Sequence, residues 1–356
     1  MVARLAGWLG GRAVCVAGAT LAAAGMLLAS LASHLPLLLL GYSVTAGLGF
    51  GMIYLPSVLA AAPHFQQRRA LAMAVTLCGS GAGTLLLAPL SQAVLQAAGW
   101  RAVLRTFSGL CMACVVCGAA LTSPAGPDSV PAPAPQSTES PNTSKPGSRL
   151  LGLVLGPALA ASPALPIFTL ILLADFFTFA AVYIPYSHLP GLAMARGLSP
   201  GQTAAVIGAG GAANTVGRLT GGGLADTRPP LPLTLLAVAT AALPCFILTA
   251  CSSLPAFLAS FALFGLLTGV QVGCASPLLV SLLGMPALAP AFGALTAGRG
   301  VAALVGPPLA GLLADTTASL ASPLHLTGGL LLAGAALYTA ALALHSSTRN
   351  SGYEQL

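Results

Sequence analysis

Three charged side chains stand inside long apolar segments of the chain, namely Asp175, Arg218 and Arg299. A charge placed in hydrocarbon costs about 2.5–3.5 kcal/mol, so each of these groups needs a partner or a water-lined cavity. The planar guanidinium of an arginine binds a carboxylate through two parallel hydrogen bonds. We therefore predict that Arg218 binds a carboxylate, and that Asp175 is its counter-ion in the empty state or a proton-binding group. A fixed ion pair between the two is the alternative.

Other side chains near these charges are candidates for the same site. Asn214 precedes Arg218 by four residues, and in a helix this spacing places both on one face. Arg299 lies between two glycines, and it either faces a cavity or extends its side chain toward the edge of the membrane. Gln271 and Phe177 lie within apolar segments, and we predict that they line the binding site. An interhelical hydrogen bond is the alternative for Gln271.

The patterns typical of enzymes and of metal or phosphate sites lack the residues that their chemistry needs. Cys111, Cys114 and Cys117 have helical spacing, but no histidine or acidic residue accompanies them. The glycine runs lack the Gly-Lys-Ser/Thr ending of a phosphate-binding loop. No nucleophile stands with a base. We predict that the protein is not an enzyme, that it holds no metal or cofactor, and that it does not bind nucleic acid.

The composition is that of a protein embedded in a lipid bilayer. Of its 356 residues, 56% are hydrophobic and 5% are charged, whereas soluble domains carry about 25% charged residues. Backbone groups in hydrocarbon must be satisfied within the segment, which favours helices. We predict an all-α polytopic membrane protein with ten spanning segments, at about 13–33, 36–61, 70–95, 102–122, 166–188, 202–225, 231–251, 255–283, 290–313 and 323–345.

A Pro- and Ser-rich stretch between the fourth and fifth segments has the composition of a flexible linker. It separates four helices from six. The predicted organisation is therefore an N-terminal bundle (1–122), a cytoplasmic linker (123–165), a C-terminal six-helix bundle (166–345) and a cytoplasmic tail (346–356).

Basic residues indicate the orientation of the chain. With a cytoplasmic N-terminus, most of them fall on the inner side, which places both termini and the linker in the cytoplasm. Arg68 and Arg69 then mark the inner end of the segment that begins at residue 70. They either lock an inward gate or anchor the topology.

Glycines indicate where helices pack closely. Gly79-Ser80-Gly81, with Pro89-Leu90 ten residues after Gly79, recurs as Gly298-Arg299-Gly300 with Pro308-Leu309. This matched spacing favours two equivalent helices in two homologous halves, and a chance match is the alternative. Small residues spaced by four let helix backbones approach one another. We predict such packing at Gly79, Gly83, Gly298 and Gly306.

Several motifs together resemble the monocarboxylate transporter family of the major facilitator superfamily. They are His64-Phe65-Gln66-Gln67-Arg68-Arg69-Ala70-Leu71-Ala72, Asn214-Thr215-Val216-Gly217-Arg218, Gly222-Gly223-Leu224-Ala225-Asp226 and the stretch 299–311. The resemblance implies a two-bundle helical fold. It also implies a plasma-membrane solute carrier, a symporter that moves small monocarboxylates or related organic anions by alternating access, with a coupled proton or another ion. Some members need a single-span immunoglobulin-like chaperone, and the resemblance implies such a partner here.

The sequence departs from the family pattern in two places. Its first residues resemble the loop before the family's third helix, so we expect an N-terminal bundle that lacks the first two helices. Asn214 stands where proton-coupled members carry an aspartate, which places proton coupling in doubt and favours solutes other than simple lactate. The alternative function is a truncated, non-transporting membrane protein that acts as an interaction partner.

Overall fold

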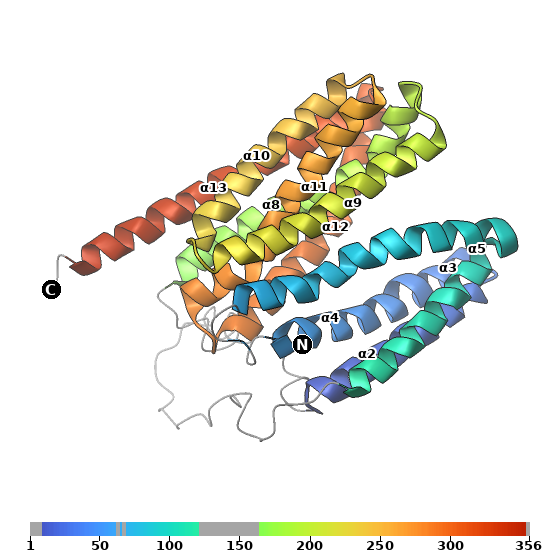
Figure 1. The fold of residues 1–356 in the computed structure, drawn as a ribbon, viewed down its shortest axis with the longest axis horizontal. Coiled ribbons are helices and arrows are strands. Elements are labelled where there is room, and N and C mark those ends of the chain that lie inside the picture. Colours follow the sequence, from blue (N-terminus) through green and yellow to red (C-terminus); the bar gives the residue numbers. More distant parts are fainter. Residues whose placement is uncertain (1–8, 62–64, 66–68, 121–163, 354–356) are drawn as a thin grey trace. The chain divides into compact units, whose positions relative to one another are not determined.

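The computed structural model describes residues 9–61, 65, 69–120 and 164–353, and within these ranges it contains helices and no strand (Figure 1). In chain order the elements are α2 (Gly11–Ser30), α3 (Leu35–Leu39), the π-helical η1 (Leu40–Ala46), α4 (Gly47–Ala61), α5 (Arg69–Ala120), α8 (Leu165–Ala195), α9 (Pro200–Ala225), α10 (Pro230–Ala250), α11 (Leu254–Leu283), α12 (Leu288–Thr317) and α13 (Ser322–Tyr353).

These elements follow the ten predicted segments closely. α3, η1 and α4 continue into one another without a break. α5 contains two helices joined at Gly99, whose φ of 77° is a conformation that glycine adopts without strain. In the part of the chain that the structure describes, eight helices are long and apolar enough to cross a membrane. The glycine-rich α9 and the beginning of α5 are not among these eight. Because the described residues form helices, the prediction of an all-α fold is confirmed.

The packing divides the described residues into two units. Residues 9–61, 65 and 86–120 form the first unit, and residues 69–85 with 164–353 form the second. The sequence placed 69–85 with the N-terminal helices, whereas the structure groups them with the later helices because they contact α9. The linker lies outside the described residues, and the division into four and six helices stays a prediction.

In the first unit, α2 packs closely against η1 and α4. A Cβ atom added to Gly25 would lie 2.5 Å from the backbone nitrogen of Ala46, and one added to Gly49 would lie 2.5 Å from that of Ala22. These helices therefore touch backbone to backbone, which only small residues permit.

In the second unit the closest packing joins α9 to α11. Three glycines spaced by four on α11 face three backbone carbonyls spaced by four on α9. Added Cβ atoms would lie 2.1 to 2.4 Å from these oxygens, in the pairs Gly265 with Gly210, Gly269 with Asn214, and Gly273 with Arg218. Because real Cβ atoms do not come so close, this row of glycines fixes the position of α9.

The four predicted packing glycines differ in their surroundings. Gly306 of α12 lies against α8, since its added Cβ would be 2.0 Å from the carbonyl oxygen of Ala180. Gly298 is also close to α8, with 3.3 Å to Leu172 Cδ1. Gly79 and Gly83 have no described atom within 4 Å of an added Cβ, which corrects the prediction for them. Gly81 makes the close contact in this helix instead, against the Thr215 side chain of α9.

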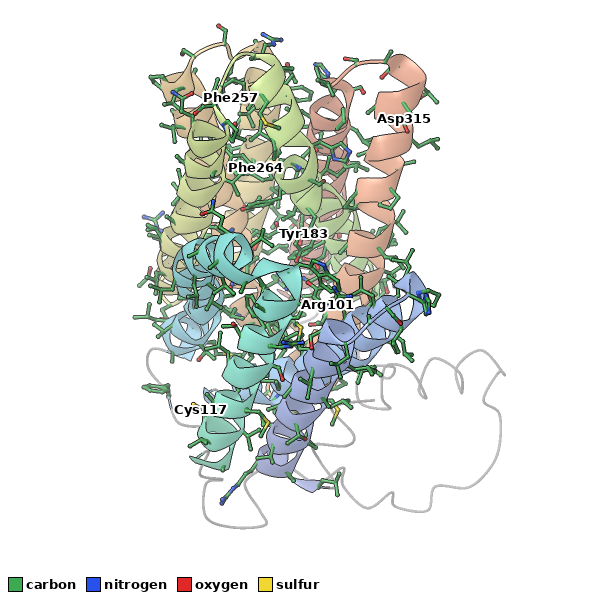
Figure 2. All side chains as sticks on the ribbon, turned by 90° about the vertical axis from the view of Figure 1, so that its right-hand side faces the viewer. Arg101, Cys117, Tyr183, Phe257, Phe264 and Asp315 are labelled. Atoms are coloured by element: carbon green, nitrogen blue, oxygen red, sulfur yellow. The ribbon has the colours of Figure 1, made fainter. Side chains whose placement is uncertain are left out.

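Aromatic side chains fill the rest of the second unit. Phe257 and Phe264 of α11 are fully buried (Figure 2). Tyr338 of α13 is the largest of the fully buried side chains among the described residues. Asp315, near the end of α12, is exposed at the surface (Figure 2).

Candidate functional site

α9 carries Arg218 and begins at a well-defined N-terminus. The Ser199 hydroxyl accepts a hydrogen bond from the backbone N–H of Gln202 at 3.2 Å, and the Gln202 side-chain oxygen accepts one from the N–H of Ser199 at 2.9 Å. This capping box satisfies two backbone donors, and Pro200 occupies the first helical turn. Together with the glycine row of α11, it holds α9 in a fixed register.

Arg218 is half-buried and connects α9 to the first part of α5. Its Nε donates to Asn214 Oδ1 at 2.9 Å, so the predicted shared face of these two residues is observed. Its Nη1 donates to the backbone oxygen of Leu77 at 2.7 Å and to the Ser80 hydroxyl. The Asn214 amide in turn donates to the backbone oxygen of Gly265 at 3.1 Å. Asn214 therefore orients the guanidinium and is itself held by α11.

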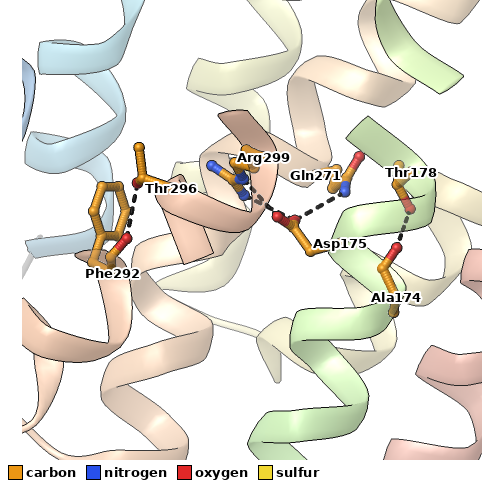
Figure 3. Close-up of polar contacts among 7 residues, drawn as sticks. All are labelled: Ala174, Asp175, Thr178, Gln271, Phe292, Thr296 and Arg299. Atoms are coloured by element: carbon orange, nitrogen blue, oxygen red, sulfur yellow. Dashed lines mark hydrogen bonds and ion pairs between the residues drawn. The ribbon is translucent and has the colours of Figure 1, made fainter. Parts of the chain in front are cut away.

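Asp175 pairs with Arg299, which corrects the prediction that it pairs with Arg218 (Figure 3). Arg299 Nε donates to Asp175 Oδ2 at 2.6 Å, and Nη2 donates to Oδ1 at 2.9 Å. The Gln271 amide donates to Oδ1 at 3.4 Å. The guanidinium lies 4.2 Å from the centroid of the Phe179 ring. With 9% and 3% of their side chains exposed, the two charges form an enclosed pair between α8 and α12.

A small cavity lies beside this ion pair. Its volume is about 10 Å³, which is close to the minimum for one water molecule. Its polar lining comes from Asp175, Thr234, Gln271 and Tyr338. The amide oxygen of Gln271 is buried and has no hydrogen-bond partner among the described residues. In this arrangement the cavity admits a water but no organic solute, so Arg299 and Gln271 are enclosed rather than open to a solute.

Phe177, the remaining predicted lining residue, is half-buried on α8. Its ring meets that of Phe176 edge to face, with the centroids 5.9 Å apart. Its contact with solute stays a prediction.

Asp226, just past the end of α9, is a residue to which the sequence analysis gave no role. Its Oδ1 accepts from the backbone N–H of Ala70 at 3.1 Å, and its Oδ2 accepts from that of Leu71 at 3.2 Å. Both N–H groups lie in the first turn of α5, where backbone donors have no partner within the helix and the helix dipole favours a negative charge. Arg68 lies outside the described residues, and so does the side chain of Arg69, so their gating role stays a prediction.

The helices and the buried charges define a polytopic membrane protein with a polar site inside one helical unit. The family model described as Major Facilitator Superfamily matches residues 1–289. Monocarboxylate transporter 11 of Homo sapiens is 30% identical over 339 residues, which are 92% of this chain and 68% of the relative. Monocarboxylate transporter 13 of Rattus norvegicus is 30% identical over 92% of this chain and 72% of its own length.

Solved structures show the same fold. The fucose:proton symporter of E. coli has a TM-score of 0.69 at 17% identity and covers 96% of this chain and 86% of its own. A human organic anion transporter has a TM-score of 0.69 at 18% identity, over 95% of this chain and 79% of its own. This chain belongs to the monocarboxylate transporter family of the major facilitator superfamily, whose members are transporters rather than enzymes.

Proposed function

We propose that this protein is a secondary-active transporter that moves small monocarboxylates, or related solutes bearing a carboxylate, by alternating access. Arg218 would bind the carboxylate with its planar fork of donors. The observation that carries the proposal is the geometry of this half-buried guanidinium, which Asn214 holds by its Nε while Nη1 bonds to neutral oxygens of Leu77 and Ser80.

Those neutral oxygens are groups that a solute carboxylate replaces favourably. A hydrogen bond between two charged groups is about twice as strong as one to a neutral acceptor. The carboxylate therefore gains more at Nη1 than the Leu77 carbonyl or the Ser80 hydroxyl loses. Asn214 keeps its bond to Nε throughout, so the fork stays oriented.

The same exchange connects solute binding to a movement of helices. Leu77 and Ser80 belong to α5, whereas Arg218 belongs to α9. When the solute takes their place, one link between the two helices is released. Alternating access requires such a release at one stage of the cycle.

The remaining features of the proposal follow the family. We place the protein in the plasma membrane with both termini in the cytoplasm. The solute is a small organic acid, with a coupled proton or another ion. A single-span immunoglobulin-like chaperone is its proposed partner.

Uptake of labelled monocarboxylates, carnitine and creatine into cells expressing the chain tests the proposal. Wild type is compared with Arg218→Ala and Arg218→Lys, and Arg105→Ala at an exposed position of α5 is the control. Losing two charge-assisted bonds costs about 3 kcal/mol, so Arg218→Ala should lower uptake at low solute concentration roughly 100-fold at equal surface amount. Arg218→Lys should recover part of it, because it keeps the charge but loses the fork.

Two results would count against the proposal. Wild-type uptake by Arg218→Ala at equal surface amount would show that another residue binds the carboxylate. A wild-type chain that reaches the surface and moves none of these solutes would favour the alternative function, an interaction partner that does not transport.

A further inference from the structure

We propose that Asp175 is the group that binds the coupled proton, and that its protonation leaves the buried charge of Arg299 to attract the solute anion. This inference rests on the proposed function and adds the site and the means of its ion coupling. Asn214, which contacts Arg218, carries an amide and cannot exchange a proton at neutral pH. Among the described acidic residues Asp175 is buried, whereas Asp226 and Asp315 are exposed.

The surroundings of Asp175 make its charge dependent on Arg299. The guanidinium of α12 and the Gln271 amide of α11 donate three hydrogen bonds to the carboxylate. Tyr338 of α13 and Thr234 of α10 complete the polar groups around the cavity beside it. Arg299 and Tyr338 are thus the charged and titratable side chains that face Asp175. Protonation of this carboxylate alone would leave the arginine charge buried and uncompensated, which is unfavourable.

A solute anion removes this obstacle. When an anion enters the second unit at Arg218, the proton on Asp175 and the negative charge of the solute arrive together. The net charge of the unit is then the same before and after loading. Binding of either one alone changes that charge by one unit in a low-dielectric interior, which is unfavourable.

The coupling requires no direct contact between Arg299 and the solute. Two unit charges about 10 Å apart at an effective dielectric constant of about 20 alter each other's binding by roughly tenfold. By linkage, a bound proton strengthens anion binding, and a bound anion strengthens proton binding by the same factor. The proton reaches the enclosed carboxyl group through the cavity, which has room for one water that can bond to the buried amide oxygen of Gln271.

Transport by Asp175→Asn measures this role directly, because the amide mimics the protonated acid permanently. Two quantities are needed: net uptake driven by an inward proton gradient, and exchange of labelled for unlabelled solute without a gradient. In wild type, one pH unit of gradient should raise the accumulation ratio up to about tenfold. Asp175→Asn should lose this response while it still exchanges labelled for unlabelled solute. Asp175→Glu should restore the response, and Asp315→Asn, the same change at an exposed site, should leave it intact.

A second variant covers the case in which Asp175→Asn does not reach the surface. The double variant Asp175→Asn with Arg299→Gln leaves no unpaired buried charge, and it should also lack the pH response. Wild-type pH dependence in either variant would overturn the inference, because the pair would then be structural only. Wild-type transport without any pH response would overturn it too, while leaving the proposed transport function standing. Absence of all wild-type transport would refute both.

Discussion

Replacing Gly217 with alanine tests whether the contact between α9 and α11 positions the site. A Cβ at Gly217 would lie 2.0 Å from the carbonyl oxygen of Leu266 and 2.9 Å from its carbonyl carbon. Both are backbone atoms, so the clash can be relieved only if the helices separate by about 1 Å or more. Gly208 provides the matched control, because it lies in the same helix and an added Cβ meets no described atom within 4 Å.

The expected magnitude follows from comparing the two variants. Both gain about 1 kcal/mol of helix propensity, so this term cancels between them. Overpacking costs about 1–3 kcal/mol, and a strained hydrogen bond from Asn214 to Gly265 adds about 1 kcal/mol. Gly217→Ala should therefore be less stable than Gly208→Ala by about 2–4 kcal/mol. Since a misplacement of about 1 Å can cost roughly 100-fold in rate, uptake per surface molecule should fall as well.

Thermal unfolding of the two variants in detergent, followed by size-exclusion chromatography, measures the stability difference. Uptake normalised to surface amount measures the functional one. Equal melting temperatures and equal uptake for Gly217→Ala and Gly208→Ala would refute the idea that this backbone contact positions Arg218.

Three further experiments test individual contacts. Asp226→Asn removes the charge at the N-terminus of α5 and should lower stability by about 0.3–1 kcal/mol in the same melting assay; no change would show that the charge is unimportant there. Asn214→Asp places a carboxylate beside Arg218, where it competes with the solute for the guanidinium. The KM for uptake should therefore rise at neutral pH and recover as acidification protonates the new acid, and a KM independent of pH would contradict this. The Sγ of Cys78 donates to the Thr215 carbonyl beside Arg218. This thiol should react faster with an anionic than with a cationic thiosulfonate, and bound solute should slow the reaction. Equal rates for the two reagents would count against the proposed location of the solute.

The sequence predicted the helices well because their signal is local. Each is a long apolar run, and its ends are marked by proline, glycine or polar residues, as at Ser199 and Gly99. It did not predict the partner of Asp175. The position of a residue along its helix does not determine the direction in which its side chain points around that helix. Asp175 points toward α12, a helix far away in sequence, and there it meets Arg299.

The glycines also show that spacing along the sequence does not determine which residues meet in the fold. The chain contains 42 of them, so a spacing of four arises often and does not by itself distinguish a packed face. Gly79 was expected at a contact, whereas Gly81, two residues later on another face, makes it. The row Gly265, Gly269 and Gly273 has three members at this spacing, a stronger pattern than the pairs on which the prediction rested.

The contacts of Arg218 differ in kind on its two sides. On the α11 side, α9 is held by backbone packing that leaves no room for a side chain, and Asn214 extends this rigidity to the Nε atom. On the α5 side, the guanidinium is held by two hydrogen bonds to neutral oxygens, which a carboxylate can replace. A transporter needs both properties at one residue. Under the proposed function, the rigid side would give the solute a fixed geometry to recognise, and the exchangeable side would let solute binding weaken the contact between the helices that must separate.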